Sequence, residues 1–278
     1  MADTLIHEPS EREEKIAKDT LERYSGSDVK DFQPYLLLTN FPKYVHYFAQ
    51  SRNVPVIEGS MFKVAHCPKE GISILDFKIG SPSAALVVDL CSFLPIKASL
   101  MLGMCGGLRR QYKIGDYFVP IASIRAEGTS NFYFPDVEVP ALANFLVQKM
   151  VTNVLEEEKI PYHIGITHTT NKRFWEFNVD FVHKIKVTRP QAIEMECATL
   201  FMAGYYHKFP LGALLLISDL PLERDGIKTK ESSENVFVKY TLDHVEIGVR
   251  ILHEFDRSLS DQPKGIFRGR RRHLEGHI

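Results

Sequence analysis

Short apolar runs alternate along this chain with segments in which apolar residues recur every three or four positions. The clearest runs, residues 34–38, 98–102 and 211–217, have the length of buried strands, and residues 140–158 have the spacing of an amphipathic helix. No Gly/Ser/Pro-rich linker divides the 278 residues, of which 44% are hydrophobic. We therefore expect an α/β fold: a single-domain three-layer α/β/α sandwich with a central, largely buried mixed β-sheet.

The two ends of the chain differ in composition from its middle. Within the polar beginning, residues 10–24 predict a surface helix that Ser10 caps, with Glu13 three positions on. The end of the chain is basic, with its arginines gathered in residues 268–272, as is typical of a solvated or partner-contacting tail. We expect an N-terminal helical extension, one catalytic domain and a basic tail: residues 1–30, 31–260 and 261–278.

Composition excludes several classes of protein. The net charge of −1 gives no overall field that would favour nucleic acid or a membrane surface. No run approaches the roughly 18 apolar residues of a membrane span, and the first residues carry no apolar secretory segment. The eleven histidines and four cysteines show no metal-ligand spacing. These patterns predict a reduced, cytoplasmic protein that holds no metal or cofactor.

Two turns could approach a ligand. Thr39 and Asn40 follow a short strand and are expected to cap a helix over residues 42–51; such a turn suits an anion, although a plain helix cap explains it equally well. The stretch Gly103-Met104-Cys105-Gly106-Gly107 predicts tight turning or close approach of backbone to a ligand. Its spacing matches neither common phosphate-binding glycine motif.

Two further stretches carry acidic side chains where ligands bind in α/β folds. An extended Glu194-Met195-Glu196 would put both carboxylates on one face and the thioether on the other. Ser218-Asp219 ends an apolar strand, the edge at which open α/β sheets hold their ligands. Taken alone, the glutamates could equally be surface residues at a helix start, and the aspartate could be an ordinary cap.

The order of these motifs resembles the nucleoside phosphorylase/nucleosidase superfamily. The glycine stretch, Glu127-Gly128-Thr129-Ser130, the Glu-Met-Glu stretch and the Ser-Asp pair follow one another over about 120 residues. Within that superfamily the chain looks most like the AMP nucleosidases, with shared stretches at residues 20–26, 38–41, 105–117 and 171–176. The resemblance covers roughly residues 18–258 and implies a nucleoside phosphorylase-like fold.

The resemblance implies hydrolysis of the N-glycosidic bond of AMP to adenine and ribose 5-phosphate. Asp219 would protonate purine N7 as general acid, and Ser218 would hold its carboxyl. Glu196 would accept hydrogen bonds from the ribose hydroxyls, Met195 would pack on the sugar, and Glu194 has a weaker claim to the ribose. The base would lie against four residues, with Phe174 the first choice for stacking and Trp175 the second: Phe174, Trp175, Gly106 and Cys105.

Departures from the phosphorylase pattern indicate water as the nucleophile. Phosphorylases of this superfamily carry an arginine and a serine for inorganic phosphate where this chain has Met101 and Met104. A third phosphate-binding arginine is matched by Lys43. The 5′-phosphate of AMP still needs polar ligands, for which Arg125, Lys43 and Asn40 are expected.

Other functions remain open from the sequence. The chain could be a purine nucleoside phosphorylase or a nucleosidase acting on an unphosphorylated nucleoside. It could also be a catalytically inactive nucleotide-binding protein, or a protein whose basic tail binds nucleic acid, although the overall charge speaks against nucleic acid as a partner. The resemblance implies a homo-oligomer, usually a hexamer, whose exposed apolar residues such as Phe132 would cover an interface.

Overall fold

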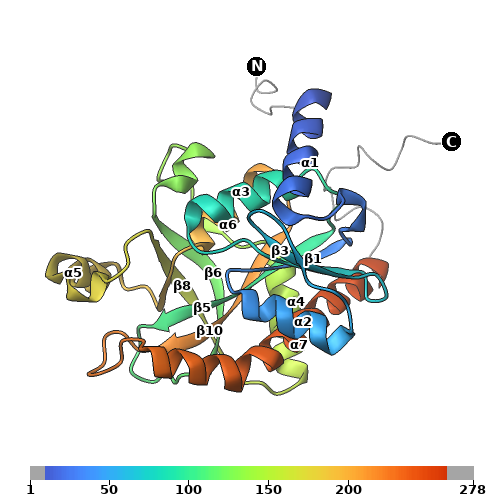
Figure 1. Cartoon of the computed structure of the whole chain (residues 1–278). Coiled ribbons are helices and arrows are strands. Elements are labelled where there is room, and N and C mark those ends of the chain that lie inside the picture. The colour runs from blue at the N-terminus through green and yellow to red at the C-terminus, as the bar shows by residue number, and fades with distance from the viewer. Residues whose placement is uncertain (1–9, 262–278) are drawn as a thin grey trace.

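The computed structural model describes residues 10–261, which form one ten-stranded mixed sheet covered by helices (Figure 1). The strands are β1 (Tyr35–Thr39), β2 (Ile57–Glu58), β3 (Lys63–Cys67), β4 (Ile72–Asp76), β5 (Ala98–Gly107), β6 (Tyr117–Ala126), β7 (Ala141–Leu142), β8 (Tyr162–Thr170), β9 (Ala192–Glu194) and β10 (Leu211–Asp219). Their order is β10-β6-β8-β9-β5-β1-β4-β3-β2, with β7 beside β6. Because β10 also pairs with β5, the strands β10, β6, β8, β9 and β5 close into a ring.

Helices cover both faces of the sheet. Buried side chains of α1, α3 and α6 pack in one apolar cluster, and those of α2, α4 and α7 pack in another. The described helices are α1 (Glu11–Ser25), α2 (Pro42–Arg52), α3 (Ser81–Cys91), α4 (Phe145–Glu157), α5 (Val179–Thr188), α6 (Cys197–Tyr206) and α7 (Lys230–Asp261), with 3-10 turns η1 (Val29–Asp31), η2 (Thr129–Phe132) and η3 (Trp175–Phe177). The predicted single-domain α/β fold with a mixed sheet is therefore confirmed, and the basic tail lies outside the described residues.

The parallel strands β10, β5, β1 and β4 form the centre of the sheet. All ten residues of β5 are buried, as expected for a strand covered by helices on both faces. Because both faces of the strand are buried, residues 98–102 do not alternate between apolar and polar side chains. The strand then runs on through Gly107, so the predicted tight turn at the glycine stretch was wrong.

Local sequence signals located most of the helix starts. Ser10 and Glu13 form the predicted capping box of α1. At α2 the cap is Phe41, which makes no side-chain hydrogen bond, so the expected cap by Thr39 or Asn40 was wrong. The sequence did not predict β7 or α5; α5 projects from the body of the protein at the left of Figure 1.

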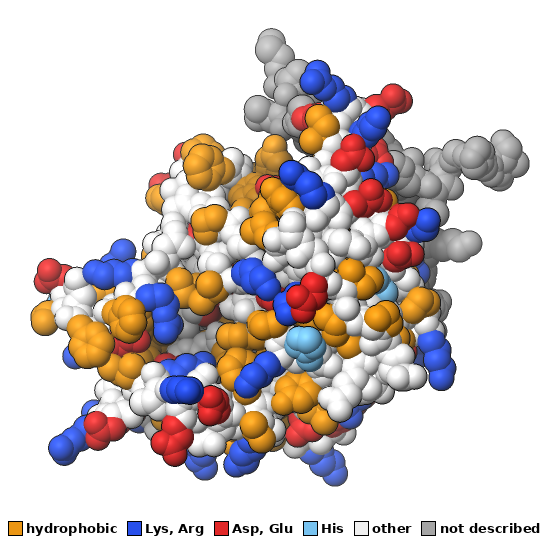
Figure 2. Space-filling model, in the orientation of Figure 1, with side chains coloured by type: hydrophobic (Ala, Val, Ile, Leu, Met, Phe, Trp, Pro, Cys, Tyr) orange, Lys and Arg blue, Asp and Glu red, His pale blue; other side chains and the backbone are white. Residues whose placement is uncertain are grey.

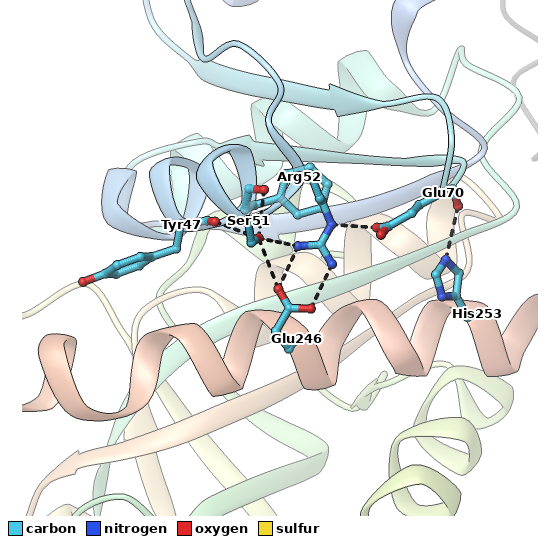
Figure 3. A network of polar contacts seen from close by, with 7 residues as sticks. Tyr47, Ser51, Arg52, Glu70, Glu246 and His253 are labelled. Carbon is cyan, nitrogen blue, oxygen red and sulfur yellow. Dashed lines mark hydrogen bonds and ion pairs between the residues drawn. The ribbon is translucent and has the colours of Figure 1, made fainter.

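An arginine joins α2, α7 and the β3–β4 turn (Figure 3). The Arg52 side chain is 6% exposed, and its Nε donates to Glu70 Oε2 at 2.6 Å. Its two terminal nitrogens donate to the two carboxylate oxygens of Glu246 at 2.8 and 3.0 Å. The two hydrogen bonds of this forked geometry fix the relative orientation of the two side chains in addition to pairing their charges. Arg52 therefore fixes the long C-terminal helix against the central sheet.

We expect Arg52→Met to lower the free energy of unfolding by about 2 kcal/mol, because it leaves two partly buried carboxylates without their shared cation. Urea unfolding followed by circular dichroism measures this change. Arg250→Met is the matched control: Arg250 contacts Glu158 at 2.6 Å, but its side chain is 48% exposed, and an exposed ion pair contributes less than about 1 kcal/mol. Equal effects of the two substitutions would contradict the assignment.

Candidate active site

The Ser218-Asp219 pair lies at a bulge where β10 ends. The pairing of β10 with β5 shifts register between Ile217 and Asp219, so Ser218 has no Cα partner on β5. Bulges of this kind re-aim side chains next to active sites. Here the Ser218 hydroxyl donates to Asp219 Oδ1 at 2.7 Å, which fixes the carboxyl group and leaves its second oxygen available. Asp219 is partly exposed at the strand end.

Part of one edge of β5 is unpaired. On the side away from β10, β5 pairs with β1 as far as Leu102 and with β9 from Gly106 onward. Within the described sheet, residues 103–105 have no strand partner on that side. Their backbone polar groups therefore face the gap between the end of β1 and the start of β9. The glycine stretch is therefore part of a strand whose edge is open over residues 103–105.

Gly106 joins the two acidic motifs. It pairs with Asp219 on β10 and with Ile193 on β9, which places the two motifs on strands that flank one residue of β5. A Cβ at this position would come within 3.0 Å of Pro221 and 3.2 Å of Ile193. Cys105, next to it, is buried among apolar groups, and that burial raises the pKa of its thiol well above the usual value. A thiol in this state is a poor nucleophile.

Glu194 is fully engaged by the start of α6. Its Oε2 accepts hydrogen bonds from the backbone N–H groups of Glu196 at 2.7 Å and Cys197 at 2.6 Å. Its Oε1 accepts from the Thr169 hydroxyl, and that hydroxyl accepts from the N–H of Ala198 at 2.9 Å. These acceptors satisfy the N–H groups that the first turn of a helix leaves open. The extended conformation ends at Glu194, so the two glutamates do not share one strand face.

Glu196 is a buried carboxylate at the gap, with 3% of its surface exposed. Its Oε1 accepts from the N–H of Gly80 at 2.8 Å, and the Asn40 side chain hydrogen-bonds the same carboxyl. Burial, and then the charge of Glu194, raise the pKa of Glu196 to about 7. The neighbouring Ser81 hydroxyl donates to Met195 O at 2.7 Å. The start of α3 therefore holds the Met195-Glu196 peptide in place.

The two expected base-binding aromatics lie in different environments. Phe174 is 71% exposed and has a positive φ of 56°, at the turn that leads into η3. Trp175 is buried in a small cluster with Leu108, Ile185 and Ile193. The tryptophan thus anchors α5 to the body of the protein, and Phe174 is the aromatic with a free ring face.

The three residues expected to bind phosphate have different contacts in the structure. All five N–H groups of Arg125 are used within its own loop, by Ser130 Oγ, Asn131 Oδ1 and the backbone oxygens of Phe134, Asp136 and Val139. Lys43 lies over the ring of Phe237, with Nζ 4.8 Å from its centroid. Asn40 faces Glu196, and its Oδ1 is buried without a hydrogen-bond partner. Arg125 stabilises the loop after β6 in this conformation.

The sequence missed several residues that shape the site. Gly80 and Ser81 at the start of α3 contact the Glu-Met-Glu stretch, and Thr169 on β8 contacts Glu194. Gly80 has a φ of 101°, which a glycine adopts without strain. The Gly-Ser-Pro sequence marked a helix start, but nothing in it indicated which strand lay opposite.

Lys228 also reaches this region from the segment after β10. Its Nζ lies 3.6 Å from Met104 Sδ, on the unpaired edge of β5. Met101 and Met104 are both buried there, at 1% and 8% exposure.

Residues 10–261 contain neither a metal-binding cluster nor a membrane-spanning helix. No group of three or more His, Cys, Asp or Glu side chains in this part of the chain is arranged to hold a metal ion. No helix within it is long and apolar enough to cross a membrane.

A separate surface cavity of ≈ 440 Å³ lies beside α5, and none of the predicted site residues lines it.

The fold and these motifs define a nucleoside-cleaving α/β enzyme family, and the chain belongs to it: residues 29–252 match the Phosphorylase superfamily. Among solved structures, it is similar to AMP nucleosidase from Bacteroides thetaiotaomicron, with 35% identity, a TM-score of 0.77 and coverage of 89% of this chain and 99% of that one. Uridine phosphorylase from Vibrio fischeri, at 19% identity and a TM-score of 0.73, shares the fold.

Curated relatives include both kinds of enzyme. AMP nucleosidase of Escherichia coli strain K12 is 27% identical over an alignment of 278 positions. The alignment covers 84% of this chain and 57% of that protein. Guanosine phosphorylase of Halorubrum lacusprofundi is 27% identical over 198 residues, which cover 70% of this chain and 80% of the relative. The chain thus spans little more than half the length of the E. coli relative.

Proposed function

We propose that this protein hydrolyses the N-glycosidic bond of AMP to adenine and ribose 5-phosphate. The observation that carries the proposal is the pairing of Gly106 with both Ile193 and Asp219, since it places the strand that leads to the buried Glu196 and the strand that ends in the serine-held Asp219 on either side of one residue of β5. Similarity to AMP nucleosidases at 35% and 27% identity supports AMP as the substrate.

Asp219 is the general acid of the proposed reaction. Adenine is a poor leaving group as an anion, so a proton delivered to N7 lowers the barrier to breaking the bond. The hydrogen bond from Ser218 Oγ to Asp219 Oδ1 leaves Oδ2 free to hold that proton and aim it at the base. Ser218 acts as the positioning residue.

Glu196 and Met195 hold the ribose. An ionised Glu196 accepts hydrogen bonds from the 2′- and 3′-hydroxyls, and its charge stabilises the cationic sugar that develops as the bond breaks. Met195 packs against the sugar. Glu194, whose two oxygens already accept three hydrogen bonds, contributes by fixing the start of α6 and thus the Glu196 backbone. Phe174 stacks on adenine, with Gly106 and Cys105 behind it.

Water is the proposed nucleophile. Met101 and Met104 place apolar groups at the two β5 positions where phosphorylases of this superfamily carry an arginine and a serine, so β5 itself offers inorganic phosphate neither of those ligands. The exposed apolar residues of the β6 and β8 regions, among them Ile121, Phe132 and Ile164, support assembly as a homo-oligomer, with a hexamer as the expected form.

The proposal predicts adenine release from AMP in phosphate-free buffer. Chromatography of the reaction would detect adenine and ribose 5-phosphate in equal amounts, and adding inorganic phosphate would not raise the rate. Because the relatives include phosphorylases, adenosine with phosphate is the matched comparison. Faster cleavage of adenosine than of AMP, or cleavage that requires phosphate and yields a sugar 1-phosphate, would overturn the proposal in favour of a phosphorylase.

A further inference from the structure

Lys228 is held between two ordered segments. Before it, the chain after β10 folds back on itself: Leu220 N–H donates to Gly226 O at 3.1 Å, and a Cβ on Gly226 would lie 2.0 Å from Leu220 O. After it, Thr229 and Ser232 exchange hydrogen bonds at the start of α7, with Ser232 N–H to Thr229 Oγ1 at 3.2 Å. Lys228 therefore extends toward β5 from a fixed position.

The Lys228 ammonium has a poor partner in this structure. Its one hydrogen-bond contact within residues 10–261 is the Met104 thioether at 3.6 Å. No carboxylate oxygen of these residues lies within 4.0 Å of Lys228 Nζ, the limit for an ion pair. Sulfur in a thioether is a weak acceptor, whereas an ammonium carries three donors. Burial lowers the pKa of Lys228, and the charge of Arg173 lowers it further, while Asp219 opposes this shift.

A second cation lies near enough to Lys228 for the two charges to repel each other. Arg173 directly precedes Phe174, the aromatic with a free ring face, and its charge disfavours that of Lys228. Among the described residues, Arg173 also has no ion pair. Figure 2 shows Lys and Arg side chains on both sides of the hollowed region between α5 and the start of α7. Two unpaired cations that repel each other are stabilised when an anion binds between them.

We propose that Lys228 and Arg173 form the subsite that binds the 5′-phosphate of the substrate. The inference rests on the proposed function, since Asp219 would then lie at purine N7. In a nucleotide with its base turned away from the sugar, the 5′-phosphate lies on the C8 side of the purine, next to N7. A phosphate near Asp219 thus falls near Lys228, and the occupied Arg125 is not needed for it.

The same placement gives the phosphate a part in catalysis. A doubly charged phosphate near Asp219 disfavours the ionised carboxylate and so keeps the general acid protonated. Adenosine lacks this charge, so its cleavage would proceed without this effect of the phosphate on Asp219. Discrimination between AMP and adenosine would therefore be seen in kcat as well as in KM.

The test compares Lys228→Met with Lys230→Met, an exposed lysine two residues away that starts α7. For Lys228→Met we expect kcat/KM for AMP to fall about 100-fold, because a charged hydrogen bond to phosphate is lost. The slow cleavage of adenosine should stay within about twofold, and Lys230→Met should match the wild type on both substrates. Arg173→Gln should reproduce the loss on AMP. An equal loss on AMP and adenosine would overturn the subsite and make Lys228 a partner of Asp219.

Binding of ribose 5-phosphate, measured by calorimetry against ribose, separates this inference from the proposed function. Tighter binding of ribose 5-phosphate that disappears in Lys228→Met supports the subsite, even for a protein that fails to cleave AMP. Ribose 5-phosphate bound equally by the wild type and Lys228→Met overturns the subsite, even if AMP is the substrate.

Discussion

Replacing Asp219 with asparagine is expected to lower kcat for AMP cleavage by about 10³-fold while leaving the Kd of AMP within about threefold. The asparagine carbonyl can still accept the hydrogen bond that Ser218 donates at 2.7 Å, so the side chain keeps its orientation. Its amide can donate a hydrogen bond to N7 but cannot transfer a proton. The substitution therefore removes the chemical step and preserves the contact.

Single-turnover adenine release and calorimetric binding measure the two effects separately. Asp225→Asn is the matched control, because the Asp225 side chain is 95% exposed in the following loop. A substrate whose leaving group needs no protonation gives a sharper test: Asp219→Asn should cleave such a ribose 5-phosphate derivative at close to the wild-type rate. A large loss of the cleavage rate with that substrate, or an equal loss of AMP affinity, would show that Asp219 has a structural role and does not donate the proton.

The sequence predicted the layers of this fold because its strands and helices carry strong local patterns. The first five residues of β5 could be predicted from a continuous apolar run, and α4 from the spacing of its apolar residues. The closure of the sheet through β10 and β5 could not, since strand pairing depends on side chains far apart in the chain. The small helix α5 was missed for a related reason: it packs through a cluster of only a few buried residues.

The site was predicted in its residue types and less well in its geometry. Ser218 and Asp219 were recognisable as polar residues ending an apolar strand, but the register shift that sets their positions depends on β5. Arg125 was a reasonable phosphate ligand by charge, yet five acceptors in its own loop occupy its guanidinium. Glu194 and Glu196 are alike in sequence, and only the hydrogen bonds around them show that their carboxylates differ in availability.

Glu196→Gln is expected to lower kcat/KM for AMP at pH 8 by about 100-fold, because the neutral amide stabilises the cationic sugar less than a carboxylate does. It should also change the pH profile. The pKa of Glu196 is raised to about 7, so wild-type kcat/KM should fall as the pH drops below 7 and this side chain takes up a proton. The glutamine variant should lack that limb, and initial rates between pH 5 and pH 9 would measure both effects.

The raised pKa of Glu196 also predicts that Glu196→Gln is more stable than the wild type at high pH. The usual pKa of the glutamate is 4.5, so folding favours the protonated form, and its contribution is full below pH 4.5 and is lost as pH rises through 7. Above pH 7 the buried carboxylate then costs roughly 3 kcal/mol, which the amide avoids. We expect Glu196→Gln to unfold at a higher urea concentration than the wild type at pH 8 and at a similar one at pH 4.5.

Glu194→Gln is the comparison that gives this result its meaning. Its carboxylate accepts three hydrogen bonds at the start of α6, so the amide should destabilise the protein at both pH values. If the Glu196 variant is more stable but slower and the Glu194 variant is less stable, the charge of Glu196 serves substrate binding and catalysis. The charge of Glu194 then serves the stability of the fold. If both variants lost stability at pH 8, Glu196 would be a structural residue like its neighbour, and the ribose would need another acceptor.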